Sequence, residues 1–119
     1  MEKINVQDKL SLFTDHWNPK IIGELNGQQV KLVKIKGEFS WHAHDHEDEL
    51  FYVIRGSFRM DFRDQSVVLN EKELIVVPRG VEHRPVAEEE ACIMLFEPAS
   101  TINTGNQENS FTKLILEKI

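Results

Sequence analysis

The sequence predicts an all-β domain of the sandwich or barrel type. Short apolar segments rich in Val, Ile and Phe recur at close intervals, and Gly, Pro, Asp or Asn bounds each of them. Such a rhythm of short strands and turns is typical of sandwiches and barrels. The chain has 119 residues and no internal repeat or linker-like stretch. We therefore expect a single domain over residues 1–119, with a core barrel at about 19–98.

The N-terminal part of the chain contains one expected helix and one expected hairpin. Apolar residues within 4–13 are spaced as on a short amphipathic helix. Expected strands over 20–25 and 30–37 flank an Asn-Gly pair, which is a strong hairpin signal. In the second of these strands apolar residues alternate with lysines, so we expect it to be half buried.

The rest of the chain predicts strands separated by polar turns. Their expected ranges are 49–56, 57–62, 66–69, 73–78, 83–87 and 91–98. Glu88–Glu90 predicts a solvated turn, and residues 99–110 are polar and predict a loop. Residues 111–119 fit either a strand or a final helical turn.

The strand that begins at Glu49 is apolar on both faces. Glu49, Phe51 and Val53 share one face, and the alternate residues are apolar as well. Both faces should therefore be covered, one by the barrel interior and the other by the N-terminal segment, a second sheet or a partner subunit. We expect a homodimer. The same alternation predicts a cavity lined by Phe51, Val53, Met60, Met94 and Phe96.

Composition excludes several classes of protein. The net charge of −6 argues against a nucleic-acid partner or an anionic membrane, since both normally require a basic patch. No apolar run approaches the ~20 residues that span a bilayer, and the first residues lack the apolar core of a secretory signal. Cys92 is the single cysteine and predicts a buried, reduced thiol, so we expect a cytoplasmic protein.

A cluster of histidines and carboxylates predicts a metal site. His42 and His44 are two residues apart, which on a strand puts both side chains on one face with their Cα atoms about 7 Å apart. Residues 45–48 form the expected turn, and Glu49 begins the strand that returns beside the histidines. Two histidines and one carboxylate with open positions are the facial arrangement used for divalent transition metals such as iron.

A fourth candidate ligand, His83, follows a predicted turn. Pro78 should end the preceding strand, because proline cannot donate a ladder hydrogen bond. The chain must then reverse within a few residues to aim His83 inward. We therefore expect Gly80 to have positive φ, which only glycine adopts at little cost.

His46 offers an alternative ligand set. It shares the parity of the other two histidines, so a shifted set of His44, His46 and Glu49 is conceivable. We favour the set with His42, because the shifted set leaves too short a connection to Glu49. His46 is then expected to be an exposed turn residue.

Two motifs resemble those of the cupin superfamily. The first cupin motif reads Gly, a spacer, His-x-His, a short spacer, Glu, six residues and Gly; the second reads Pro-x-Gly-x-x-His. The matching residues are Gly37, His42, His44, Glu49, Gly56, Pro78, Gly80 and His83. The resemblance implies a small jelly-roll β-barrel, in which the metal ligands are His42, His44, Glu49 and His83; the short N-terminal helix is expected from the apolar spacing alone.

The chain departs from the cupin pattern in three places. The spacer after Gly37 is one residue short, Lys72 stands where the second motif normally opens with glycine, and Ala87 replaces its terminal asparagine. These positions shape turns, so the expected ligand set is unaffected, but they weaken assignment to any one subfamily.

The expected site leads to two hypotheses about function. We expect one divalent transition ion per chain, drawn from Fe, Mn, Ni, Zn, Co and Cu, and a small-molecule ligand. The first hypothesis is an isomerase-like, lyase-like or dioxygenase-like enzyme of small oxygen-rich metabolites, and the alternative is a non-catalytic module that binds or senses a small ligand or metal. A phosphorylated sugar would need basic groups, for which the candidates are Arg59, Arg63 and Arg84. No catalytic residue is assigned; Glu82 and Glu97 are candidate bases, although their sequence context predicts solvent exposure.

Overall fold

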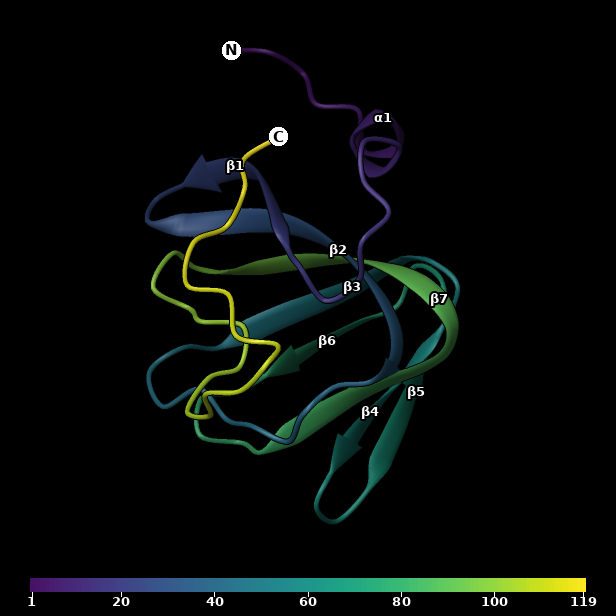
Figure 1. Ribbon diagram of the computed structural model, residues 1–119, viewed down its shortest axis with the longest axis vertical. Helices are drawn as coiled ribbons and strands as arrows, with labels where there is room; N and C mark the ends of the chain where they lie inside the picture. The colour runs from purple at the N-terminus through teal and green to yellow at the C-terminus, as the bar shows by residue number, and fades with distance from the viewer.

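The computed structural model describes residues 1–119 and confirms the all-β fold with a short N-terminal helix (Figure 1). Its elements are α1 (Val6–Leu10), β1 (Lys20–Leu25), β2 (Gln28–Glu38), β3 (Glu49–Arg55), β4 (Phe58–Phe62), β5 (Ser66–Leu69), β6 (Leu74–Val77) and β7 (His83–Pro98). All strand pairs are antiparallel. The sheet runs in the order β1-β2-β7-β3-β6, with β4 pairing with both β7 and β5, and it does not close.

Strand β7 joins the two halves of the sheet, because it pairs with β2, β3 and β4. It is one long strand, so the expected turn at Glu88–Glu90 is wrong. The three glutamates lie within the strand and are exposed. Opposite them, the pairing jumps from Ala91 with Ile35 to Ala87 with Gly37, so β7 carries extra residues against β2. This bulge turns the glutamates toward solvent without ending the strand.

The hairpin between β1 and β2 is confirmed at the predicted Asn-Gly pair. Asn26 has φ of 50° and Gly27 has φ of 77°. Two successive residues with positive φ are what a two-residue hairpin of type I′ requires, and Asn and Gly accept this conformation most readily.

Two apolar clusters lie on opposite faces of the sheet. The larger cluster fills the interior and includes Phe51, Val53, Met60 and Ile93. The smaller one packs α1 against the outer face through Leu10, Phe13, Leu32 and Cys92. The N-terminal segment therefore covers part of the outer face, and Cys92 is buried as predicted. No helix is long and apolar enough to cross a membrane.

The C-terminal segment forms neither of the expected alternatives for 111–119. It runs as irregular chain along the edge of β1 (Figure 1). Ile21 donates its N–H to the carbonyl of Glu117 at 2.9 Å and accepts a hydrogen bond from the N–H of Ile119 at 3.1 Å. A single parallel bridge between Ile21 and Lys118 takes the place of a strand.

Lys72, which stands where the second motif normally opens with glycine, has a left-handed backbone conformation. Its φ is 68°, in the left-handed region that is costly for a side chain with a Cβ atom. Its N–H donates to the carbonyl of Val53 at 2.8 Å, which holds the turn before β6 in place.

We predict that Lys72→Gly stabilises the protein. Glycine removes the left-handed strain but makes the unfolded chain more flexible, and the balance should raise the free energy of unfolding by about 1 kcal/mol. Urea denaturation measures the change. Lys72→Ala is the matched control, because it removes the same side chain and retains the strain. Equal stability of the two variants would contradict the prediction.

Candidate metal centre

The four predicted ligands come from the ends of strands and the segment between β2 and β3. Glu49 is the first residue of β3, and His83 is the first residue of β7. His42 and His83 form a two-way main-chain bridge, with N–H to carbonyl distances of 3.1 and 2.9 Å. The carbonyl of His44 accepts the N–H of Gly80 at 2.8 Å. Main-chain pairing between distant parts of the sequence therefore holds the backbones of the three histidines close together.

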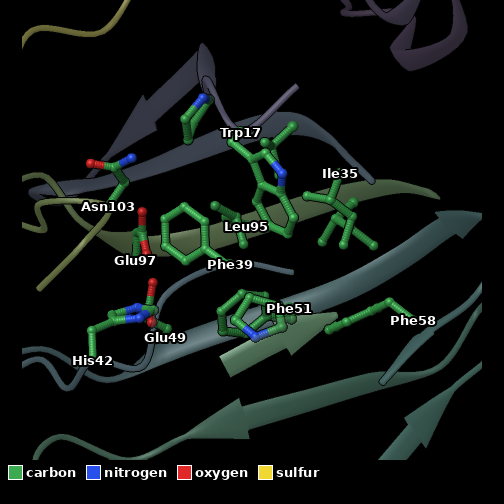
Figure 2. Close-up of a pocket in the computed structure, with 14 residues that line it drawn as sticks. Trp17, Ile35, Phe39, His42, Glu49, Phe51, Phe58, Leu95, Glu97 and Asn103 are labelled. Atoms are coloured by element: carbon green, nitrogen blue, oxygen red, sulfur yellow. The ribbon is translucent and has the colours of Figure 1, made fainter. Parts of the chain in front are cut away.

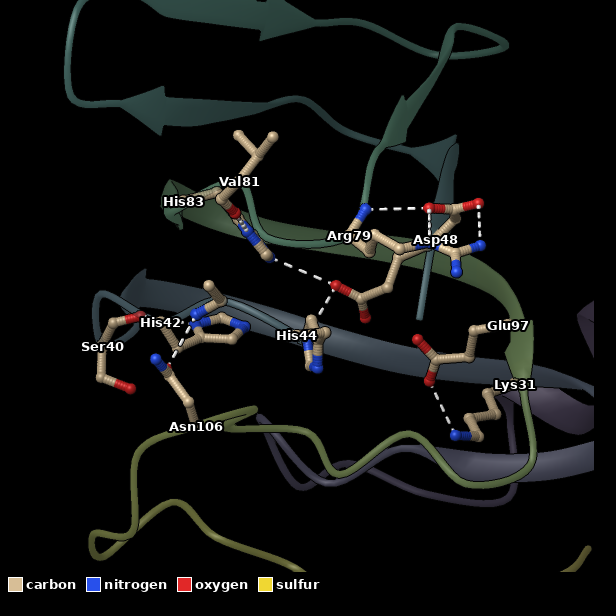
Figure 3. Close-up of polar contacts among 12 residues, drawn as sticks. Lys31, Ser40, His42, His44, Asp48, Arg79, Val81, His83, Glu97 and Asn106 are labelled. Atoms are coloured by element: carbon tan, nitrogen blue, oxygen red, sulfur yellow. Dashed lines mark hydrogen bonds and ion pairs between the residues drawn. The ribbon is translucent and has the colours of Figure 1, made fainter. Parts of the chain in front are cut away.

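The side chains converge on one point. The candidate ligand atoms of His42, His44, Glu49 and His83 all lie within 4.8 Å of one another, and all four residues are buried. Oε1 of Glu49 lies 2.8 Å from Nε2 of His44 and 3.2 Å from Nε2 of His83 (Figure 3).

Several of these buried atoms have no hydrogen-bond partner. They are both ring nitrogens of His44, Nε2 of His83 and Oε1 of Glu49. An unpaired buried polar atom costs about 1–3 kcal/mol, so such atoms are rare and usually mark a functional site. Imidazole nitrogen and carboxylate oxygen are ligands for divalent transition metals, and a cation at their meeting point would compensate Oε1 of Glu49, Nε2 of His83 and one ring nitrogen of His44. The donor set therefore fits a metal ion.

Hydrogen bonds to the main chain orient two of the imidazoles. Nδ1 of His42 lies 2.9 Å from the carbonyl oxygen of Ser40, and Nδ1 of His83 lies 2.9 Å from that of Val81 (Figure 3). A carbonyl oxygen only accepts, so each Nδ1 carries the proton and donates it. Each Nε2 is then left with a free lone pair, as metal binding requires.

Burial also favours the neutral form of His42. It lowers the pKa of His42 to about 4, and the neighbouring His83 acts in the same direction. For Glu49, burial opposes ionisation, but the close approach of Glu97, His44 and His83 outweighs burial and holds the pKa well below the ordinary range. Neutral imidazoles beside an ionised carboxylate are the protonation states that bind a cation.

Gly80 has the predicted conformation. Its φ is 79°, and it lies between Pro78 and His83 in the turn that follows β6. A Cβ atom at this position would meet nothing within 4 Å, so the need for glycine comes from the backbone angle alone.

Glu97 is buried, which corrects the expected solvent exposure. It is 2% exposed, and its Oε1 accepts a hydrogen bond from Nζ of Lys31 at 2.7 Å (Figure 3). Burial and the charge of Glu49 raise the pKa of Glu97, while Lys31 opposes the shift. Lys31 is 1% exposed, so the alternation predicted for this strand, apolar residues inside and lysines outside, is wrong at this position. The two residues form an ion pair beside the metal ligands that the pattern of β2 did not reveal.

A cavity of about 50 Å³ lies beside the cluster (Figure 2). Its lining residues are Trp17, Pro19, Val33, Ile35, Phe39, His42, Glu49, Phe51, Phe58, Pro85, Ile93, Leu95, Glu97 and Asn103. Phe51 was predicted. Val53 and Met60 are buried in the adjoining core but do not line the cavity. The prediction that Met94 and Phe96 line the cavity is wrong, because the residues of β7 that face inward are Ile93 and Leu95.

The backbone of Trp17 is strained where it lines this cavity. Its φ is 60°, which is rare for a bulky residue and costs about 1–3 kcal/mol. Two hydrogen bonds to β2 hold it: the main-chain N–H donates to the carbonyl of Lys34, and indole Nε1 donates to that of Lys36, both at 2.9 Å. The indole consequently stacks on Phe39 with ring centroids 4.7 Å apart.

The other polar residues considered from sequence lie outside the cavity. His46 is exposed, as expected. Arg59 and Arg84 both bind the carboxylate of Asp61, and the three hydrogen-bonded neighbours of Asp61 hold its pKa well below its usual range, Arg59 first, then Arg84 and Ser66. Arg63 pairs with the exposed Glu82 at 3.1 Å. None of these residues lines the cavity.

The comparisons with known proteins agree with this fold. The cupin domain family matches residues 30–96, so the chain belongs to the cupin family. A crystal structure of a cupin-2 domain containing protein from Shewanella frigidimarina is 52% identical with a TM-score of 0.79, covering 80% of this chain and 93% of that one. Protein NMB1881 from Neisseria meningitidis is 35% identical with a TM-score of 0.76, covering 82% of this chain and all of that one.

A third relative matches over a shorter stretch. The uncharacterized protein YdbB of Bacillus subtilis is 39% identical over 64 residues, which cover 53% of this chain. The match spans 57% of the length of YdbB.

The lowered pKa of His42 predicts a pH-dependent stability. Between about pH 6.5 and about pH 4 the unfolded chain binds a proton that the folded protein does not, so the free energy of unfolding falls as the pH drops through this window. For chelator-treated protein the loss should be about 3 kcal/mol, measured by urea denaturation. His42→Gln should flatten the dependence, whereas His46→Gln, at an exposed histidine, should leave it unchanged. An unaltered slope in His42→Gln would contradict the prediction.

Proposed function

We propose that this cupin binds one divalent transition metal ion through His42, His44, Glu49 and His83 and acts on a small oxygen-bearing molecule bound beside the metal. The observation that carries the proposal is the set of buried ligands whose candidate atoms converge within 4.8 Å, with atoms of His44, Glu49 and His83 lacking hydrogen-bond partners. The relatives described above support the fold on which this site stands, and their names assign no reaction.

The arrangement of donors is suited to a metal that works as a Lewis acid. Four protein ligands leave one or two positions for an oxygen atom of water or substrate, which the bound metal would polarise. The main-chain carbonyls of Ser40 and Val81 fix the rings of His42 and His83 through their Nδ1 protons. The aromatic walls around the cavity exclude bulk water, which strengthens electrostatic interactions within it.

The polar groups around the cavity limit the ligand that fits. The side-chain amide of Asn103 is engaged, because it donates to the carbonyl of Phe111 and accepts the N–H of Lys113, both at 2.8 Å. Oε2 of Glu97 has no hydrogen-bond partner and is available to accept a hydrogen bond from a hydroxyl. Because the arginines lie outside the cavity and its walls are mostly apolar, the cavity favours a compact ligand with an apolar body and metal-binding oxygens over a phosphorylated sugar.

Two reaction types remain within this proposal, and one alternative competes with it. Dioxygenase-like chemistry and isomerase-like chemistry both use an open metal position next to a bound oxygen ligand. The alternative is a non-catalytic module that senses a metal or a small ligand. The cavity volume of about 50 Å³ favours that alternative, because pockets for drug-sized ligands measure about 300–1,000 Å³.

Metal-loaded protein assayed with candidate diols and keto compounds distinguishes these possibilities. Oxygen uptake supports the dioxygenase, and carbonyl migration without oxygen uptake supports the isomerase. Tight ligand binding without turnover would reject the enzyme in favour of the sensing module.

We predict about one divalent transition ion per chain in protein purified without an affinity tag. His42→Ala combined with His44→Ala should abolish binding, since it removes two of the four ligands, and elemental analysis measures the loss. His46→Ala is the control and should keep the metal, because His46 is exposed and outside the cluster. Full occupancy in the double variant would refute the site.

We also propose that a second copy of the chain covers the outer sheet face that α1 leaves free. Leu74 and Val76 on β6 are 55% and 52% exposed. They pair with Tyr52 and Leu50 on β3, so the four residues form one apolar strip. An exposed apolar strip on a sheet favours association.

This proposal predicts a dimer at micromolar concentration by light scattering. Val76→Glu should shift the protein toward monomer, because it places a charge in the strip without disturbing a buried residue. Glu71→Lys is the control, since Glu71 is exposed in the turn before β6 and changes charge outside the strip. A monomeric parent protein would exclude the dimer.

A further inference from the structure

The segment after β7 makes close contact with the chain between two of the proposed ligands. The main-chain N–H of Asn106 donates to the carbonyl of Ala43 at 2.8 Å. In return, Oδ1 of Asn106 accepts the N–H of Ala43 at 3.0 Å (Figure 3). Ala43 is flanked by His42 and His44, so both of its main-chain polar groups are held by a single residue more than sixty positions away in the chain.

Gly105 allows this approach. A Cβ atom at Gly105 would lie 2.2 Å from the carbonyl oxygen of Ala43 and 3.2 Å from Cδ2 of the His42 ring. The first of these distances is far shorter than any tolerated contact with main chain, which cannot move aside as a flexible side chain can. Gly105 also has φ of 55°. Both observations require glycine where the segment crosses the His42–His44 stretch.

Two further contacts join the same segment to the surroundings of His42. Nδ2 of Asn109 donates to Oγ of Ser40 at 3.1 Å, and the carbonyl of Ser40 orients the His42 ring. Phe111 packs on Phe39 with ring centroids 4.9 Å apart, and Phe39 in turn contacts the His42 ring at 5.4 Å. The segment thus contacts Ser40 before His42 and Ala43 after it. It also contacts Phe39, which packs against the His42 ring.

We propose that Gly105 and Asn106 are positioning residues of the metal centre, which fix the main chain of Ala43 and thereby the directions of His42 and His44. The proposal rests on the metal site proposed above. Neither residue touches the metal position, and both lie beyond the stretch 30–96 that matches the cupin domain family. The device is therefore carried by the C-terminal segment of this chain rather than by the matched domain.

The test compares variants of the full chain loaded with Co²⁺. Asn106→Ala removes the acceptor for the Ala43 N–H, and we expect it to weaken Co²⁺ affinity about 10-fold or more, as loss of a group that orients a ligand typically does. The visible absorption of bound Co²⁺ should also change, because it reports coordination geometry, which a purely structural contact would leave alone. Asn106→Asp supplies a carboxylate oxygen in place of the amide oxygen as acceptor and should restore both affinity and spectrum. Ser110→Ala, at an exposed serine of the same segment, is the matched control.

Gly105→Ala should weaken Co²⁺ binding further than Asn106→Ala does. Circular dichroism first checks that the Gly105→Ala protein has the wild-type β-sheet. If this variant does not fold, Asn106→Ala is the decisive variant. Unchanged Co²⁺ affinity and spectrum in Asn106→Ala, with normal binding by the parent protein, would overturn the positioning role and leave the metal site standing. Failure of the parent protein to bind Co²⁺ would overturn the metal site, and the positioning role with it.

Discussion

The two-way main-chain bridge between His42 and His83 is the constraint on which the candidate metal centre depends. It joins the segment after β2 to the first residue of β7, so two ligands from distant parts of the sequence lie opposite each other in an antiparallel pair. Pairing of β4 with the same end of β7, Phe62 opposite His83, holds that end from its other side. Because these contacts are main-chain hydrogen bonds, the fold can place the imidazoles without relying on a metal to gather them.

Pre-assembly of this kind has an electrostatic cost that the interior of the protein has to compensate. Glu49 and Glu97 are both buried, and the charge of Glu49 opposes ionisation of Glu97. The ammonium group of Lys31, 2.7 Å from the carboxylate of Glu97, compensates the charge of Glu97. The histidines are then the groups that face the charge of Glu49. The ion pair is therefore better understood as local charge balance than as a source of stability, since buried pairs seldom repay their own desolvation. A cation at the cluster would complete the balance around Glu49.

Much of the fold and most of the site could be predicted from the sequence, because both depend on local patterns. Alternation in β3, the Asn-Gly hairpin and the positive φ of Gly80 are properties of a few neighbouring residues, and His42, His44, Glu49 and His83 have characteristic spacing. The failures have a common cause in long-range pairing. The bulge in β7 keeps Glu88–Glu90 within a strand, and the inward residues of β7 are Ile93 and Leu95 rather than Met94 and Phe96. Lys31 and Glu97 read as surface charges until β2 and β7 bring them together, and Gly105 shows its purpose only against Ala43.

The irregular segment along β1 has a consequence for how the chain avoids self-association during folding. Strand β1 is the outermost strand beside β2, and an open strand edge invites pairing with other chains. Ile21 gives its free N–H and carbonyl to Glu117 and Ile119, which blocks part of that edge. Those residues leave the ribosome after every strand of the sheet. During synthesis the edge of β1 therefore stays available to neighbouring chains until the C-terminal segment has been made. Until then, only exposed charges near the edge, such as Glu24, oppose pairing between nascent chains.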